Sequence, residues 1–264
     1  MLASLFKPSP LLDADSKQWL IDTFIWAVEN FGESYFKEQS QLILPTNTFY
    51  PGKVSSIEEM TQLVFRNTLD YAGMQDWPIS LYSPEQFAQL PNIMPQLGFT
   101  DALRGNDIQV SHNDYQQGSA MRIPLSFNPQ QINQPQDLVA TMVQQLSAAL
   151  IQYRKSPIPG SEKLAPQAVD VVASVMGFGV IFANTAYQFK GGCGSCYNKM
   201  ANRQASLPEA DTVFTLALYC VAKGIDKKHV VPHLKSHLRG HYKKAIKELS
   251  KDGINDLASM KLHR

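Results

Sequence analysis

Two stretches of the chain are apolar around almost their whole helical circumference, and this pattern limits the fold more than any other feature. Residues 137–153 and 166–189 both follow helical periodicity, and each carries only a narrow polar or small stripe. A helix of this kind has no broad face suited to water, so both are predicted to lie inside the protein. Buried polar groups need partners, so we expect the two stripes to face each other across a shared polar pocket.

The residues of the two stripes are chemically unusual for a core. The first stripe holds Thr141, Gln144, Gln145 and Ala148, and the second holds Asp170, Ser174, Gly177, Ile181 and Asn184. A carboxylate among Val, Ala, Met and Phe is costly unless it is paired or protonated. Gly177 and Gly179 leave room for another backbone or side chain to approach. The alternative is local: Asp170 caps a neighbouring element, and the glutamines satisfy backbone groups of a predicted hairpin.

The rest of the pattern favours an α+β fold with a small mixed or antiparallel sheet packed on a helical half. We predict a strand at 41–45, a strand at 77–83 and a hairpin from 107–112 and 121–127. The predicted helices are 16–31 with Asp15 or Ser16 as its cap, 56–73 capped by Ser56, 137–153 capped by Asp137, 166–189, 206–224 and 228–249. Residues 1–264 are read as a single domain, with a mixed part at 1–134 and a helical part at 135–264.

Composition and charge exclude some classes of protein. Residues 223–264 carry 11 Lys and Arg against 4 Asp and Glu, but aromatic residues are not interleaved with them, so a solvated helix is favoured over a nucleic-acid surface. The most apolar stretch, 171–183, is shorter than the roughly 20 residues that span a bilayer. Prolines interrupt the N-terminus, and three cysteines fit a reducing compartment, so we expect a cytoplasmic protein without a membrane span.

Several segments together resemble small bacterial zincin-type metallopeptidases. "LVATMVQQLSAAL" at 138–150 is similar to the family's L-V-A-T-x-x-H-E-x-x-H helix, and "VDVVASVMGFGVIFANTAYQF" at 169–189 is similar to its second apolar helix. "SLPEADTVFTLALYCVAKG" resembles the helix that follows, and "LILPTNTFYPG" resembles a segment near the family's start. The resemblance covers about 138–224 and implies a zincin-like fold whose active-site helix is 137–153.

The residues that do the chemistry in that family are missing here. Two histidines at i and i+4 bind one Zn²⁺, the adjacent glutamate acts as general base, and an acidic residue of the second helix completes or orients the site. Gln144 stands at the first histidine, Gln145 at the base and Ala148 at the second histidine, whereas Asp170 matches the acidic position. The resemblance therefore implies a degenerate metallopeptidase, and we expect no zinc and no other cofactor at this site.

The leading hypothesis is a catalytically inactive zincin-like protein that binds an unknown protein, peptide or small ligand. Its degenerate pocket would consist of Gln144, Gln145, Ala148, Asp170, Ser174 and Asn184. One alternative is a structural zinc site that combines Cys193 and Cys196 of the C-x-x-C with two histidines of the row that begins with His229 and His233. Another is a hydrolase with a relocated site, in which Asp170 works with Asp114 or His112.

Overall fold

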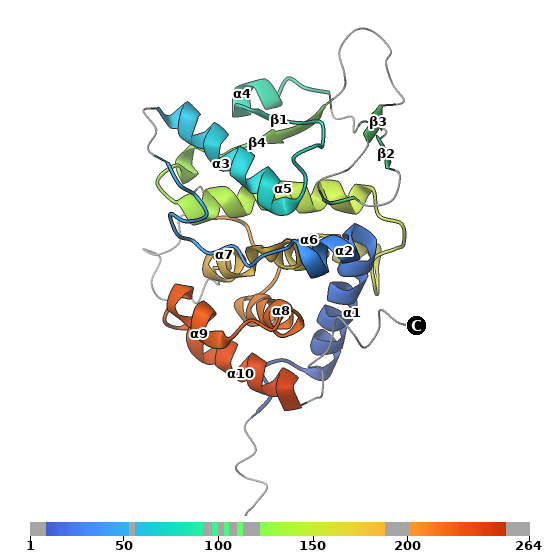
Figure 1. Ribbon diagram of the computed structural model, residues 1–264, viewed down its shortest axis with the longest axis vertical. Helices are drawn as coiled ribbons and strands as arrows, with labels where there is room; N and C mark the ends of the chain where they lie inside the picture. The colour runs from blue at the N-terminus through green and yellow to red at the C-terminus, as the bar shows by residue number, and fades with distance from the viewer. Residues whose placement is uncertain are drawn as a thin grey trace, which may run out of the picture.

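Two apolar helical runs lie across the middle of the molecule in the computed structural model of the chain (Figure 1). One is α5 (Pro135–Gln152). The other is a bent run that consists of α6 (Ala165–Ala173), a π-helical turn (Ser174–Phe178) and α7 (Gly179–Thr185). Most of their side chains are buried, as their apolar circumference predicts, and the two runs pack against each other.

The structure describes residues 9–52, 56–91, 95, 97–99, 103–105, 110–112, 122–187 and 201–251. The other helices in these ranges are α1 (Ala14–Phe31), α2 (Glu33–Glu38), α3 (Ile57–Ala72), α4 (Pro84–Phe87), α8 (Glu209–Ala222), α9 (Lys227–Val230) and α10 (Leu238–Lys251). The chain is mixed helix and sheet and 61% helical, which confirms the predicted α+β class at that level.

The helices form layers on either side of α5 (Figure 1). On one side lie α3 and the strands, and both α3 and one of the strands contact α5. On the other side α6 and α7 are followed by α8 and then by α10, which packs on α8. The first helix, α1, runs along the edge of this second layer and contacts α6 and α8, so the N-terminal helix is packed on the helical half.

The strands pair differently from the sequence prediction. β1 (Ile79–Tyr82) pairs in parallel with β4 (Ile123–Ser126), while β2 (Leu97–Phe99) pairs antiparallel with β3 (Val110–His112). The predicted hairpin of 107–112 with 121–127 is therefore wrong, since its two strands belong to separate two-stranded sheets. Alternating apolar residues identify a strand but not its partner, and the nearest strand in the sequence was the incorrect choice.

Residues 41–45, predicted as a strand, form no strand and instead dock on the bend between α6 and α7. Ile43 N donates to the carbonyl oxygen of Gly177 at 2.9 Å. Gly177 has φ +100°, and a Cβ placed there would lie 2.1 Å from the carbonyl oxygen of Gln41. The room that the sequence predicts at Gly177 is thus occupied by this backbone, which also explains why the predicted helix 166–189 is bent.

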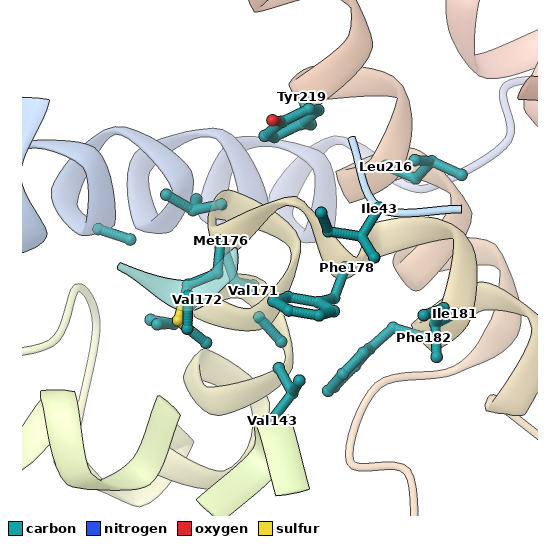
Figure 2. Close-up of a cluster of buried hydrophobic side chains, with 14 of the residues drawn as sticks. Ile43, Val143, Val171, Val172, Met176, Phe178, Ile181, Phe182, Leu216 and Tyr219 are labelled. Atoms are coloured by element: carbon teal, nitrogen blue, oxygen red, sulfur yellow. The ribbon is translucent and has the colours of Figure 1, made fainter. Parts of the chain in front are cut away.

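The side chains around this bend form the centre of the core. Figure 2 shows Ile43 from the docked segment together with side chains from α5, the bent run and α8: Val143, Val171, Val172, Met176, Phe178, Ile181, Phe182, Leu216 and Tyr219. All of these side chains are buried. The helical run Glu162–Thr185 is long and apolar enough to cross a membrane by length and composition, but 72% of its most apolar window is buried within the protein, as in the core helices of many proteins.

The predicted helix caps are partly correct. Ser56 caps α3, and its hydroxyl accepts a hydrogen bond from Glu59 N at 3.1 Å. The cap of α1 is Asp13, which accepts from Ser16 N at 2.9 Å, so the prediction of Asp15 or Ser16 is wrong. Several capping-type residues stand in a row here, and local sequence does not decide which of them leaves the helix.

Two further predictions about helix ends are wrong. Asp137 lies inside the first turn of α5, where it is buried instead of capping the helix. The predicted helix 228–249 is divided into α9, a 3-10 turn at Val231–His233 and α10. Pro232 lies in the interruption, and because proline lacks a backbone N–H it cannot continue the hydrogen-bond ladder.

We predict that Gly177→Ala destabilises the protein by about 3 kcal/mol or more, since the new Cβ adds overpacking against backbone to left-handed strain. Gly240→Ala is the matched control: Gly240 lies in α10, and a Cβ there meets nothing within 4 Å. That variant should gain up to about 1 kcal/mol from helix propensity. Urea unfolding measures both. Similar stabilities for the two variants would contradict this account of the bend.

Candidate functional site

Asp170, the acidic residue that the sequence singles out on α6, is fully buried and accepts four hydrogen bonds. Its Oδ1 accepts from Arg203 Nη1 at 2.9 Å and from Gln144 Nε2 at 3.2 Å. Its Oδ2 accepts from the backbone N–H groups of Ser206 and Leu207, at 2.9 and 3.0 Å. Each oxygen therefore has two donors, which accounts for most of the accepting capacity of a carboxylate.

Arg203, from the segment that precedes α8, is the buried counter-ion of Asp170. Neither side chain of this ion pair is exposed to solvent. The guanidinium also donates through Nε to Thr185 Oγ1 at 3.1 Å and through Nη2 to the carbonyl of Phe182 at 3.3 Å, and it lies 4.2 Å from the centre of the Phe182 ring. Burial lowers the pKa of Arg203, and the Asp170 carboxylate opposes this by raising it.

The backbone of the same segment is held by a second carboxylate. Arg203 N donates to Asp137 Oδ1 at 2.7 Å, and Tyr187 Oη donates to Asp137 Oδ2 at 3.2 Å. Burial raises the pKa of Asp137, while the hydrogen bond from Arg203 lowers it. Arg203 is thus bound by two carboxylates from different helices, Asp137 on α5 and Asp170 on α6.

The adjacent glutamines of α5 point to different partners. Gln144 Nε2 donates to the carbonyl of Gln204 at 2.9 Å as well as to Asp170. Gln145 accepts from Ser126 N at 2.9 Å through Oε1 and donates to Ser126 O at 2.7 Å through Nε2. Gln145 therefore pairs with β4 as a neighbouring strand would, while Gln144 closes the site around Asp170.

Within the described part of the chain, the other predicted pocket residues make no hydrogen bond to the Asp170 carboxylate, and each has its own surroundings. Ser174 donates to the backbone carbonyl of Asp170, one turn earlier in its own helical run, at 3.3 Å. Asn184 donates to Gln136 Oε1 and to the carbonyl of His233, both at 2.9 Å. Ala148 is half-buried and offers no polar group. The structure thus brings together Gln144 and Asp170, while the polar groups of Ser174 and Asn184 bond to other atoms.

The alternative metal ligands are only partly covered by the structure. Cys193 and Cys196 lie outside the described residues, as does Asp114, and the side chain of His112 is not described either. His229 is exposed on α9, and His233 is half-buried in the turn that follows it. Within the described ranges, no three His, Cys, Asp or Glu side chains are grouped so that they could share a metal ion.

A second arginine, Arg104, is also buried, and the sequence analysis did not predict it. Arg104 donates through Nε to the carbonyl of Ala72 at 2.6 Å and lies over the ring of Tyr35, 4.7 Å from its centre. Burial lowers its pKa to about 10, and Tyr35 acts in the opposite direction. Among the described residues it has no carboxylate partner. Its contacts join α2 to the end of α3, away from Asp170.

Comparisons of this chain with protein-family models, curated proteins and solved structures return no match. What the site can do must therefore be read from its geometry. Both oxygens of Asp170 are engaged by donors, so this carboxylate is poorly suited to take a proton from a substrate or to bind a metal in this conformation. The arrangement instead fixes the 203–207 segment against α5, α6 and α7.

We predict that Arg203→Met destabilises the protein by about 3–5 kcal/mol, because it leaves the Asp170 carboxylate buried without a cation. The control is Arg154→Met. Arg154 pairs at 2.8 Å with Glu162, whose side chain is 58% exposed, and a surface pair of this kind contributes about 1 kcal/mol or less. Urea unfolding at neutral pH compares the two. Equal losses of unfolding free energy in the two variants would show that the buried Asp170 pair stabilises the protein no more than the surface pair does.

We also predict a loss of stability in alkaline solution to which Tyr187 contributes. Burial, aided by Asp137, raises the pKa of Tyr187 from 10.0 to about 12. A folded pKa above the unfolded one gives stability that is complete below pH 10 and is lost as the pH rises toward 12. Unfolding free energies measured across this range should fall less steeply for Tyr187→Phe than for the wild type. Parallel curves would contradict the prediction.

Proposed function

We propose that this chain is a zincin-like protein without peptidase activity that acts by binding a ligand or partner. The observation that carries the proposal is the contact between Gln144 and Asp170, whose polar atoms are 3.2 Å apart. The family resemblance assigns these two positions to one metal site, although they are far apart in the sequence and belong to different helices. Their direct contact is what a shared ancestral site predicts.

Arg203 supports the absence of zinc in this proposal. A carboxylate that once helped to hold a divalent cation needs another positive charge when the metal is lost, since an unpaired buried charge is costly. The Arg203 guanidinium supplies that charge at 2.9 Å from Asp170 Oδ1. A zinc ion at Asp170 would have to displace Arg203 and also face its repulsion. The Arg203 guanidinium thus takes the electrostatic role that a metal ion has in the family.

Gln145 supports the loss of the general base. Its amide uses both ends on the backbone of Ser126, donating to the carbonyl and accepting from the N–H. An ionised glutamate at 145 could accept from the N–H but could not donate to the carbonyl. The position that holds the base in the family is therefore engaged in fastening α5 to β4.

We propose that the zincin-like unit is a single domain over residues 1–264, that it is cytoplasmic, and that its partner is not a nucleic acid.

Metal analysis tests the proposal. We expect wild-type protein, expressed in zinc-supplemented medium and dialysed, to carry far less than one zinc per chain by elemental mass spectrometry. The double variant Gln144→His/Ala148→His should bind zinc at least about tenfold more tightly than wild type, because imidazoles at i and i+4 can share one ion. Adding Arg203→Met should strengthen binding further by freeing Asp170, provided that the triple variant folds.

Two outcomes would overturn the proposal. One is stoichiometric zinc in the wild-type protein that disappears in Gln144→Ala or Asp170→Asn. The other is a double variant that binds zinc no better than the single variant Ala148→His, which is the matched control with one imidazole at the same place. Circular dichroism of each variant separates a lost site from a lost fold.

A further inference from the structure

A pocket of about 300 Å³ lies between α3, the start of α5, the 45–52 segment and Ile181 of α7. Its volume falls at the lower end of the range of about 300–1,000 Å³ that is usual for small-molecule sites. The lining residues are Pro45, Thr46, Asn47, Tyr50, Pro51, Gly52, Met60, Leu63, Val64, Asn67, Pro135, Gln136, Val139 and Ile181. Gln144, Asp170 and Arg203 are not among them, so this is a separate place in the fold.

Among the described residues that line this pocket, the phenol of Tyr50 is the one ionisable side chain. Aliphatic side chains and prolines form most of this described wall, and it contains no Lys, Arg, His, Asp or Glu. Burial raises the pKa of Tyr50 well above its usual value, so the phenol stays neutral. A charged ligand would lose its hydration here without gaining a counter-ion, and the pocket therefore selects against both anions and cations.

Asn67 is a polar residue of the lining whose amide nitrogen is buried without a partner. Its Nδ2 is buried, and its amide makes no hydrogen bond to any described residue. Its polar neighbours differ: Tyr50 Oη lies 3.3 Å from Thr68 Oγ1, and Gln136 Oε1 accepts from Asn184 Nδ2 at 2.9 Å. A partly buried amide without partners is costly, and an amide that turns its N–H₂ group toward the pocket could donate to a ligand oxygen, which would offset part of that cost.

The walls of the pocket are held in place by contacts outside it. Ile43 N bonds to Gly177 O just before the 45–52 segment, and Tyr71 Oη donates to the carbonyl of Phe49 within that segment. Pro45, Pro51 and Pro135 restrict the backbone on two sides of the opening. A pocket whose walls are fixed before binding pays less ordering entropy when a ligand enters.

We propose that this pocket binds an uncharged small molecule with an apolar ring or chain and one carbonyl-type oxygen, which accepts a hydrogen bond from Asn67. The apolar wall selects the body of the ligand, the lack of charge excludes ions, and the unpaired amide requires an acceptor. This inference rests on the proposed function, in that it supplies the ligand of a protein that binds without catalysis.

Nuclear magnetic resonance of protein labelled with [methyl-¹³C]methionine tests the proposal, since Met60 lines the pocket whereas Met74, Met142 and Met176 are buried outside it. The probes are 2-acetylnaphthalene, which is an uncharged ketone, naphthalene-2-carboxylate and 2-naphthylmethylammonium. We expect the ketone to shift the Met60 signal in a saturable way and to leave the other three nearly unchanged. The two charged probes should bind at least about tenfold more weakly, because neither finds a counter-ion.

Three variants locate the ketone. Asn67→Leu keeps the size of the side chain but removes its donor, so ketone affinity should fall about fivefold to tenfold. Val64→Trp places an indole in the pocket from the face of α3 that also carries Asn67, and it should abolish the shift of the Met60 signal. Ile57→Trp is the matched control, since Ile57 is on α3, is 58% exposed and does not line the pocket; its affinity should equal that of wild type.

The proposal is overturned by an unchanged Met60 signal with the ketone, by equal binding of the carboxylate, or by full ketone affinity in Val64→Trp. If Asn67→Leu does not fold, the comparison of the ketone with the two charged probes and the Val64→Trp variant still test the proposal. Zinc content measured on the same wild-type sample and on Asp170→Asn reports on the site of Gln144 and Asp170. Zinc that is lost in Asp170→Asn, together with a Met60 shift, would overturn the proposed function and keep the pocket. No zinc and no shift would overturn the pocket and keep the proposed function.

Discussion

The ion pair between Asp170 and Arg203 is the interaction on which the helical half of this protein depends. Two opposite charges without solvent exposure stabilise a fold only when their remaining hydrogen-bonding groups are satisfied, and here they are met by backbone groups of two segments and by Gln144. The pair fixes the chain that leads into α8. Because α10 packs on α8 and α1 contacts both α6 and α8, the position of the outer helices follows from it.

The sequence was most informative where periodicity and capping act locally. The apolar circumference of 137–153 and 166–189 predicted two buried helices, and Ser56 predicted the start of α3 correctly. It failed where a distant partner decides the structure. Residues 41–45 look like a strand, but a docking site on Gly177 is available to them. Pairing of β4 with β1, which comes much earlier in the chain, could not be inferred from alternation alone.

For the candidate site, the sequence identified the carboxylate and its neighbour but not the cation. The helical spacing of Gln144 and the apolar surroundings of Asp170 were enough to predict that both need polar partners. Arg203 gave no comparable signal, since it stands in an irregular segment among small and polar residues. A buried carboxylate implies a counter-ion, but the choice among the arginines and lysines of the chain is made only by the tertiary fold.

The hydrogen bond between Ile43 and Gly177 also has a consequence for how the chain reaches this fold. It joins two points separated by α3, the strands and α5, so forming it closes a long loop and gives up much chain entropy. Such non-local contacts raise the contact order and form more slowly than helices do. We therefore expect the Ile43 amide to gain its protection from hydrogen exchange after the helices on either side of it have formed.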